Sequence, residues 1–189
     1  MSYFTVDRGS QLRVGQRLDC DADYRGRRFY PVKTHYTKKD LECFTRELFP
    51  QGLSRHGKYY LLDEGLVTRD ASGAKNPGCP ATPAIELVVE LVRRLSFPTY
   101  PSRFTSIFAW ETESEAVAFR AQHGANKGTI CRISGQLGFC GDMSFLRLGG
   151  NILGSWLYAM KYWSGERSPS PQMECLLVAP VVVEEILAG

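Results

Sequence analysis

A compact group of cations, a hydroxyl and aromatic rings occupies residues 52–60. Ser54, Arg55 and His56 lie there between two glycines, and two tyrosines follow. Guanidinium groups fork onto phosphate oxygens, and aromatic rings stack on bases, so this loop is a candidate for binding phosphate or adenine. A solvated turn explains the same residues equally well. His56 could act as a base for a hydroxyl acceptor, but it has no visible partner in the sequence.

Two carboxylates near the end of the chain are candidates for electrostatic catalysis. Glu174 opens the apolar stretch 174–178, where a charge is locally unexpected. A fixed carboxylate can stabilise positive charge that develops in a transition state. The simpler interpretation is that Glu174 ends a strand in water. Glu166, in the loop after Trp163, is the rival carboxylate.

Hydroxyl and guanidinium groups also gather around residue 103. If residues 104–110 form a strand, alternation places Phe104, Ser106 and Phe108 on one side and Arg103, Thr105 and Ile107 on the other. The choice between Ser106 and Thr105 as a ligand-binding hydroxyl therefore stays open.

Several common catalytic motifs are absent from the sequence. It has no G-x-G-x-x-G after a strand, no Walker A motif, no H-E-x-x-H and no G-x-S-x-G. Its six cysteines form no C-x-x-C pair, and none stands near a histidine at zinc-finger spacing. We therefore expect reduced thiols and no metal cofactor.

The elements that position these groups follow from hydrophobic periodicity and from capping residues. Strands are predicted at 3–7, 104–110, 129–133, 174–178 and 181–186, with Pro180 breaking the last pair. Helices are predicted at 38–49 after Thr37, at 83–95 after Thr82, from the Thr112/Glu115 capping box to Gly124, and at 151–163. This pattern is typical of an α+β protein with mostly short strands.

Two of the predicted helices carry apolar side chains that we expect to face the core or a ligand. In 83–95, Ile85, Val88, Val92 and Leu95 form the expected buried stripe. In 151–163, Trp156, Tyr162 and Trp163 are either core residues or a wall on which a planar ligand ring could stack.

Size and charge favour one globular domain, 1–189. The chain has 189 residues, 43% of them hydrophobic, and a net charge of +3, which is small for a dedicated nucleic-acid-binding protein. Its first residues offer no apolar stretch of the kind that a secretory signal peptide needs. The longest apolar run, 175–183, is about half of a membrane span, so we expect a soluble protein without a membrane partner.

Three segments occur in a suggestive order: YFTVDR at 3–8, PSRFTSIFA at 101–109 and MECLLV at 173–178. Together they resemble the signature segments of ADP-ribosyltransferase-like domains, in particular the bacterial effector and toxin branch. The resemblance is nearest to small effectors that ADP-ribosylate ubiquitin on threonine and more distant to DNA-targeting toxins. It spans most of the chain and implies an ADP-ribosyltransferase-like split β-sandwich with flanking helices.

The resemblance implies that NAD⁺ is the substrate and that no metal is needed. Glu174 would be the late-strand carboxylate that stabilises the ribose as the nicotinamide–ribose bond breaks. Contacts to NAD⁺ would come from Arg8, Thr5, Arg103, Ser106, Arg55, His56, Trp156 and Tyr162. The first segment departs from the family pattern, because Phe4 stands where many members carry His. Arg8 lies four residues further, roughly 13 Å along a strand, so whether Arg8 or Arg103 holds the pyrophosphate stays open.

The resulting hypothesis is a mono-ADP-ribosyltransferase that modifies a host protein after delivery into the host cytoplasm. A threonine of ubiquitin is the acceptor that the resemblance suggests. One alternative keeps the fold and changes the acceptor to nucleic acid or to water, as in an NAD⁺ glycohydrolase. The other is a non-catalytic binding module on the same scaffold, which Phe4 would favour.

Overall fold

The computed structural model describes residues 1–27, 36–63, 82–123 and 127–187. Five strands form its sheet: β1 (Ser2–Asp7), β2 (Arg17–Leu18), β3 (Ser106–Ala109), β4 (Thr129–Asp142) and β5 (Met173–Leu187). The α-helices in the described part are α1 (Lys38–Leu48), α2 (Arg55–Lys58), α3 (Thr82–Ser96), α4 (Glu113–His123) and α5 (Ile152–Trp163). Short 3₁₀ turns cover Arg103–Thr105 and Met143–Phe145, and a π-helical turn covers Tyr59–Asp63. The protein is therefore α+β.

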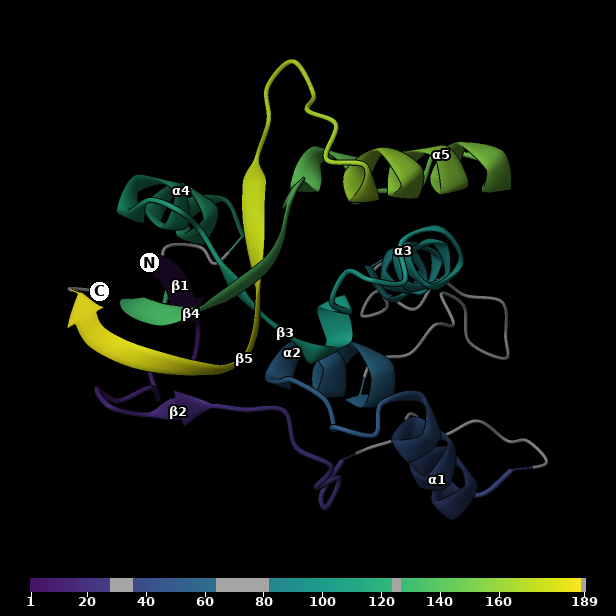
Figure 1. Ribbon diagram of the computed structural model, residues 1–189, viewed down its shortest axis with the longest axis horizontal. Coiled ribbons are helices and arrows are strands. Elements are labelled where there is room, and N and C mark those ends of the chain that lie inside the picture. Colours follow the sequence, from purple (N-terminus) through teal and green to yellow (C-terminus); the bar gives the residue numbers. More distant parts are fainter. Residues whose placement is uncertain (28–35, 64–81, 124–126, 188–189) are drawn as a thin grey trace.

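The sheet is antiparallel and is built around β4 and β5. Its order is β1-β4-β5-β2, with β3 also paired to β5. The first half of β5, 173–178, pairs with 136–142 of β4 and with β3, whereas the second half, 181–187, pairs with 130–134 of β4 and with β2. Figure 1 shows β5 changing course between these halves. The bend divides the sheet into two parts, and a bridge from Phe4 to Trp110 joins the edge of β1 to the end of β3.

Pro180 lies where β5 bends. The sequence predicts two strands broken at this proline, but β5 is one strand from Met173 to Leu187. The ladder to β4 nevertheless shifts register between Ser134 and Gln136, opposite this region of β5. Because proline has no N–H to donate, it is accommodated between the two paired stretches.

The strands β3 and β4 differ from their predicted lengths. β4 continues to Asp142, nine residues beyond the predicted end, through Gly135 and Gly138. A Cβ at Gly138 would lie 2.6 Å from Pro101 Cγ, so the glycine permits close packing where the apolar alternation fails. β3 begins only at Ser106, because residues 103–105 form a 3₁₀ turn. The prediction that Arg103 and Thr105 share one face of a strand is therefore wrong.

The helix boundaries follow the capping residues closely. Thr37 and Asp40 form a capping box at the start of α1. Thr112 and Glu115 bond reciprocally before α4, and the Asn151 side chain caps α5. Thr82 is the first residue of α3 instead of its cap. The predicted end of α4 at Gly124 lies outside the described residues.

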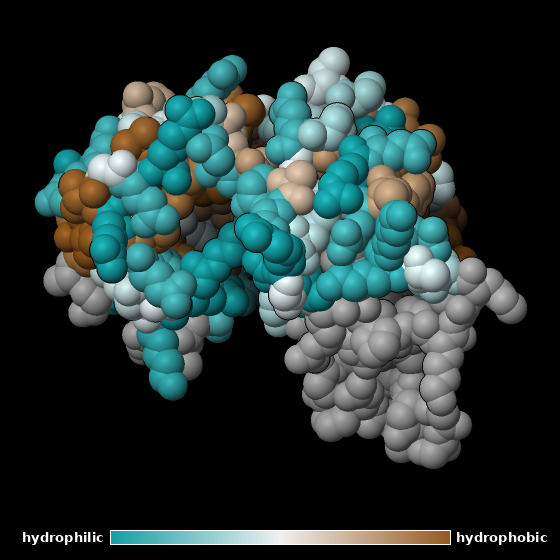
Figure 2. All heavy atoms as spheres, turned by 90° about the horizontal axis from the view of Figure 1, so that it is seen from below, coloured by the Kyte–Doolittle hydropathy of each residue, from teal (hydrophilic) through white to brown (hydrophobic). Residues whose placement is uncertain are grey.

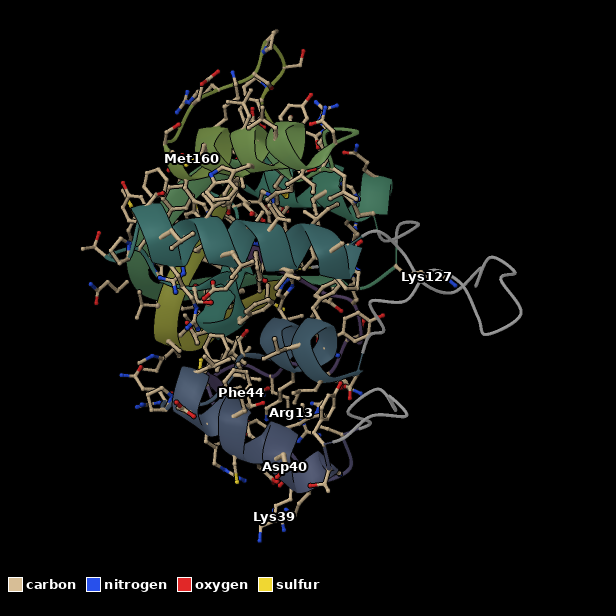
Figure 3. All side chains as sticks on the ribbon, turned by 90° about the vertical axis from the view of Figure 1, so that its right-hand side faces the viewer. Arg13, Lys39, Asp40, Phe44, Lys127 and Met160 are labelled. Carbon is tan, nitrogen blue, oxygen red and sulfur yellow. The ribbon has the colours of Figure 1, made fainter. Side chains whose placement is uncertain are left out.

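The helices cover the sheet unequally. α4 packs on β1 and β4 around Trp110, Ala116 and Ile130, whereas α3 and α5 pack over Phe139 and Leu176. Figure 3 shows α5 and α3 side by side, with Met160 on α5 and Phe44 on α1 at opposite ends of the helical side. Charged side chains that α3 directs toward this packed layer define the site.

The face on the side of β2 and α1 is mainly hydrophilic where the structure describes it (Figure 2). None of the helices in the described ranges combines the length and the apolar character that a membrane crossing requires.

Candidate functional site: a buried charge network

Arg103 and Glu174 meet where α3 and α5 pack on the sheet. Ser102 fixes the 3₁₀ turn by accepting a hydrogen bond from the Phe104 N–H at 3.1 Å. The Arg103 guanidinium then lies over the Phe108 ring, 4.7 Å from its centroid, and its Nη1 donates to Glu174 Oε1. The turn and β3 thus direct a cation toward the first residues of β5.

Arg103 also binds a second carboxylate. Its Nε and Nη2 donate to the two oxygens of Glu86, at 2.9 and 3.0 Å, in the bidentate geometry that arginine prefers. Its Nη1 donates to the Tyr162 hydroxyl at 2.8 Å, and that hydroxyl donates to Glu174 Oε1 at 2.7 Å. One cation is therefore shared by two carboxylates and a phenol, and all four side chains are buried.

Helix α3 supplies this network because its buried face carries two glutamates beside Val89 and Val92. The sequence predicts a buried stripe that ends at Leu95, but Leu95 is 69% exposed while Glu86 and Glu90 are buried. Glu90 accepts hydrogen bonds from Arg93, Arg94 and Ser102, at 2.7 to 3.0 Å. Helix α3 thus turns two glutamates, four residues apart, toward the Arg103 turn.

His56 connects the network to the protein surface. Its Nε2 lies 3.2 Å from Glu86 Oε1, and its side chain is 20% exposed. Its ring also packs against Phe108 and Tyr60, with centroid distances of 4.3 and 4.6 Å. Ser54 caps the short helix α2 on which His56 lies. The imidazole therefore has a carboxylate partner that the sequence alone does not show.

The electrostatics of the network favour the ionised forms of Glu86 and Arg103 in spite of burial. Burial alone would raise the pKa of Glu86, but the Arg103 charge and the His56 contact lower it to about 2. Burial likewise favours neutral Arg103, yet Glu174 and Glu86 hold the pKa of its guanidinium well above the ordinary value. Burial and Glu174 raise the pKa of Tyr162. The phenol therefore stays protonated and remains a hydrogen-bond donor.

Glu174 has one oxygen engaged and one oxygen without a protein donor. Both hydrogen bonds to its carboxylate, from Arg103 and from Tyr162, end on Oε1. Within the described ranges, no residue donates to Oε2. Glu174 as a whole is buried, with 2% of its surface exposed. The arrangement fixes a carboxylate rigidly and leaves half of its hydrogen-bonding capacity unused.

The sequence profile of one family, described as "Protein of unknown function (DUF2441)", matches residues 3–188. The chain belongs to this family. No curated protein matches the chain. The DUF2441 match includes every residue of the network, from His56 to Glu174, so the network is part of the family domain.

Among the residues that the sequence singles out, Arg103, Tyr162, Glu174 and His56 come together in this DUF2441 chain. Two others lie nearby without joining the network. Ser106 donates to the Ser102 carbonyl at 2.8 Å, and Thr5 donates to the Phe108 carbonyl at 2.8 Å. Both hydroxyl groups thus fix the backbone around β3. Thr105, the alternative to Ser106, donates to the same Ser102 carbonyl at 3.1 Å.

The cations Arg8 and Arg55 lie at the end of β1. Arg55 is 67% exposed and bonds to Asp7 at 3.3 Å, directly before Arg8 in the chain. Arg8 lies over the Phe119 ring of α4, 5.6 Å from its centroid. The structure therefore brings close together the segments of Arg8 and Arg55, two phosphate-binding candidates that lie far apart in the sequence.

Trp156 and Glu166 lie away from the network contacts. Trp156 is 46% exposed and lines an apolar groove of about 580 Å³ between α3 and α5. Glu166 forms an exposed ion pair with Lys161. A smaller cavity, about 150 Å³, is lined by Thr105, Cys20 and their neighbours. Glu174 lines neither of these cavities.

Sequence reasoning missed Glu86, which is central to the network. The available signal was a pair of glutamates four residues apart, Glu86 and Glu90, within the otherwise apolar stretch 83–92. Charged residues with this spacing lie on one helix face and are rarely buried without partners. Such a pair predicts buried cations nearby, although it does not identify Arg103.

Proposed function

We propose that this chain is an NAD⁺-dependent mono-ADP-ribosyltransferase that modifies a protein side chain. The observation that carries the proposal is the spatial meeting of the three segments that resemble the family's signatures. β1 contacts the end of β3 through the Phe4–Trp110 bridge, and β3 pairs with the first half of β5. These segments are separated by about a hundred and by about seventy residues in the chain, so their adjacency is not a consequence of sequence proximity.

The bent sheet supports the finer fold assignment within the proposal. A split β-sandwich requires two groups of strands that diverge from shared long strands. β4 and β5 each contribute to both halves of the sheet, with the register shift between Ser134 and Gln136 at the division. Helices α3 and α5 flank one half, as the proposed fold needs.

Glu174 would provide the main electrostatic contribution to catalysis. When the nicotinamide–ribose bond breaks, positive charge develops on the ribose, and a preorganised carboxylate stabilises it without solvent reorganisation. Arg103 and Tyr162 hold Oε1 in place, which leaves Oε2 to accept a hydrogen bond from the ribose 2′-hydroxyl. Arg103 then acts as a positioning residue, since its Nε, its Nη1 and one N–H of its Nη2 are already engaged by Glu86, Glu174 and Tyr162.

The pyrophosphate would be held by the exposed cations at the end of β1. Arg55 and Arg8 are accessible, in contrast to Arg103, and guanidinium groups match phosphate oxygens. His56 and Tyr60 provide partly exposed rings beside the network, on which an aromatic base could stack. Because Glu174 is 2% exposed, NAD⁺ binding must be accompanied by a local opening that admits the ribose.

The acceptor in this proposal is a host protein, with a threonine of ubiquitin as the first candidate to test. Transfer to nucleic acid and hydrolysis of NAD⁺ would use the same carboxylate with another acceptor. The enclosure of Glu174 favours a second candidate function, a binding module that retains the scaffold without turnover.

Labelled NAD⁺ distinguishes these functions in one experiment. The chain is incubated with NAD⁺ labelled in the adenylate part, with ubiquitin, with a protein extract and separately with nucleic acid. We expect label on protein. Label on nucleic acid would identify nucleic acid as the acceptor, and release of labelled free ADP-ribose would identify water. The absence of both turnover and NAD⁺ binding at millimolar concentration would reject the proposal.

Substitution of Glu174 by Gln tests the catalytic assignment. The amide keeps the size and accepts a hydrogen bond but lacks the charge, so kcat and kcat/KM should fall together by roughly 10²–10³. Glu166→Gln is the matched control, because its ion pair with Lys161 is exposed. Circular dichroism verifies that both variants are folded. Wild-type turnover in a folded Glu174→Gln variant would contradict the assignment.

A further inference from the structure

Two thiols face each other across the central strands. Cys140 of β4 and Cys175 of β5 are directly paired in the antiparallel register, and their Sγ atoms lie 2.7 Å apart. The adjacent pair in the ladder is Gly141 with Glu174. The Cys175 side chain lies on the face of β5 opposite to that of Glu174, because neighbouring residues of a strand point to opposite faces. On that face Cys175 packs with Tyr3.

The strand geometry suits a covalent link. Residues directly opposite in an antiparallel pair have Cα atoms roughly 4.5–5.5 Å apart, which falls within the range of about 4.4–6.8 Å found in disulfides. The two sulfurs are also closer than van der Waals contact, which is roughly 3.5–4.0 Å even between carbon atoms. We propose that Cys140 and Cys175 form a reversible intramolecular disulfide when the protein meets a peroxide oxidant.

The two cysteines are unequally accessible, which assigns their roles. Cys140 is partly exposed, whereas Cys175 is 1% exposed. A hydrogen bond from the Cys175 thiol lowers the pKa of Cys140, although burial and the Glu111 carboxylate act in the opposite direction. Cys140 is therefore the thiol that reacts first with an oxidant from solvent, and Cys175 is the resolving thiol.

The reaction balances with one peroxide molecule per disulfide. The Cys140 thiolate attacks one peroxide oxygen, the O–O bond breaks, and hydroxide leaves and takes up the thiol proton as water. The resulting sulfenic acid on Cys140 is attacked by the Cys175 sulfur. The S–O bond breaks, and a second water leaves with the Cys175 proton. Two thiols are oxidised by two electrons, and hydrogen peroxide is reduced to two waters.

A metal site is the competing interpretation of the same cluster. Ligand atoms of Glu111, Cys140 and Cys175 lie within 4.8 Å of one another. Tetrahedral zinc with bonds of about 2.3 Å would separate its two sulfurs by roughly 3.8 Å. The observed 2.7 Å is shorter than that separation by about 1 Å, which favours oxidation over metal binding.

Peptide mapping by mass spectrometry tests the proposal on the full chain. The reduced protein is treated with hydrogen peroxide, free thiols are blocked by alkylation, and the chain is digested without reductant. We expect a linked peptide pair containing Cys140 and Cys175, two hydrogens lighter than the free peptides, which dithiothreitol separates. The same link should form in Cys43→Ser, which removes an exposed thiol, and be lost in Cys140→Ser.

Three results would overturn the proposal. They are alkylation of both Cys140 and Cys175 after peroxide treatment, a link from either residue to another cysteine, and overoxidation of Cys140 without a link. A metal site would be supported instead if the reduced wild-type chain binds Zn²⁺, Cys140→Ser does not, and no link forms. The wild-type peptide map decides the matter even if a cysteine variant fails to fold.

Discussion

Arg103 carries the positive charge between two buried carboxylates, Glu86 and Glu174. Removing ions from water is costly, and their attraction offsets that cost only when geometry and hydrogen bonding are favourable. The bidentate contact to Glu86 meets this condition, and Nη1 donates to both Glu174 and Tyr162. The loss of Arg103 would therefore leave two buried negative charges without their cation.

We predict that Arg103→Ala lowers the free energy of unfolding by about 3–5 kcal/mol, the usual effect of breaking a buried ion pair. Arg103→Lys should be intermediate, because lysine keeps the charge but cannot fork. Arg8→Ala is the control, and its partly exposed contact with Phe119 should be worth about 1 kcal/mol or less. Urea denaturation measures all three variants. Equal effects of Arg103→Ala and Arg8→Ala would contradict this account of the network.

At this scale the sequence indicates Glu174, Arg103, Tyr162 and His56 only as candidates, and it does not indicate Glu86. Glu174 is recognisable because a charge opens an apolar strand. The role of Arg103 is not recognisable from the sequence, because strand alternation does not apply to a residue in a 3₁₀ turn. Its pairing with Glu86 depends on how α3 rotates against the sheet, and the apolar residues of α3 are compatible with more than one rotation.

The helices that the sequence predicts best are those whose first turns carry capping boxes. Thr37 accepts from the Asp40 N–H at 3.2 Å, and Asp40 accepts from the Thr37 N–H at 2.7 Å. Thr112 and Glu115 repeat this arrangement before α4. These contacts are local, so residue spacing alone is sufficient to locate them.

Thr37→Ala should destabilise the protein by about 0.5–2 kcal/mol, because it removes a side-chain acceptor from the start of α1. Lys39→Ala is a matched control in the same first turn, since Figure 3 shows Lys39 projecting away from the rest of the molecule. It should change stability by less than about 0.5 kcal/mol. Thermal unfolding provides the comparison. An effect of Lys39→Ala as large as that of Thr37→Ala would show that the capping box is not the cause.

The strands were harder to predict, for a physical reason. The second half of β4 contains Gly135, Gly138 and Gly141, which interrupt the apolar alternation that identifies a strand. These glycines fit because side chains of Val181, Pro101 and Tyr162 approach the backbone closely. Tertiary packing thus extends β4 to Asp142, whereas local pattern alone ends it at Ile133.

Across the whole molecule, buried carboxylates are held ionised at separate places. Burial acts against ionisation of Asp7, Glu90 and Asp142, but hydrogen bonds and cations outweigh it and lower each pKa. Asp142 accepts from the backbone N–H groups of Ser144, Ser168 and Gln172, and Asp7 from those after β1. Together with Glu86, these carboxylates make the stability of the fold depend on pH at several independent sites.

Acid should therefore destabilise the protein mainly by protonating these buried carboxylates, and less by protonating the exposed ones. A carboxyl whose pKa is lowered in the folded state binds fewer protons there than in the unfolded chain, so stability decreases as pH falls through the interval between the two values. For Glu86 the interval runs from the ordinary value of 4.5 to about 2. Its contribution is on the order of 3 kcal/mol, present above pH 4.5 and lost progressively below it.

Urea denaturation between pH 7 and pH 3 measures this dependence, and Glu86→Gln isolates the contribution of one site. The variant should be less stable at pH 7, because Arg103 loses a partner, but its stability should fall less steeply between pH 4.5 and pH 3. Glu166→Gln, which alters an exposed pair, should follow the wild-type curve in parallel. A Glu86→Gln curve parallel to that of the wild type would mean that Glu86 is not held ionised by Arg103, and the charge network would lose its electrostatic basis.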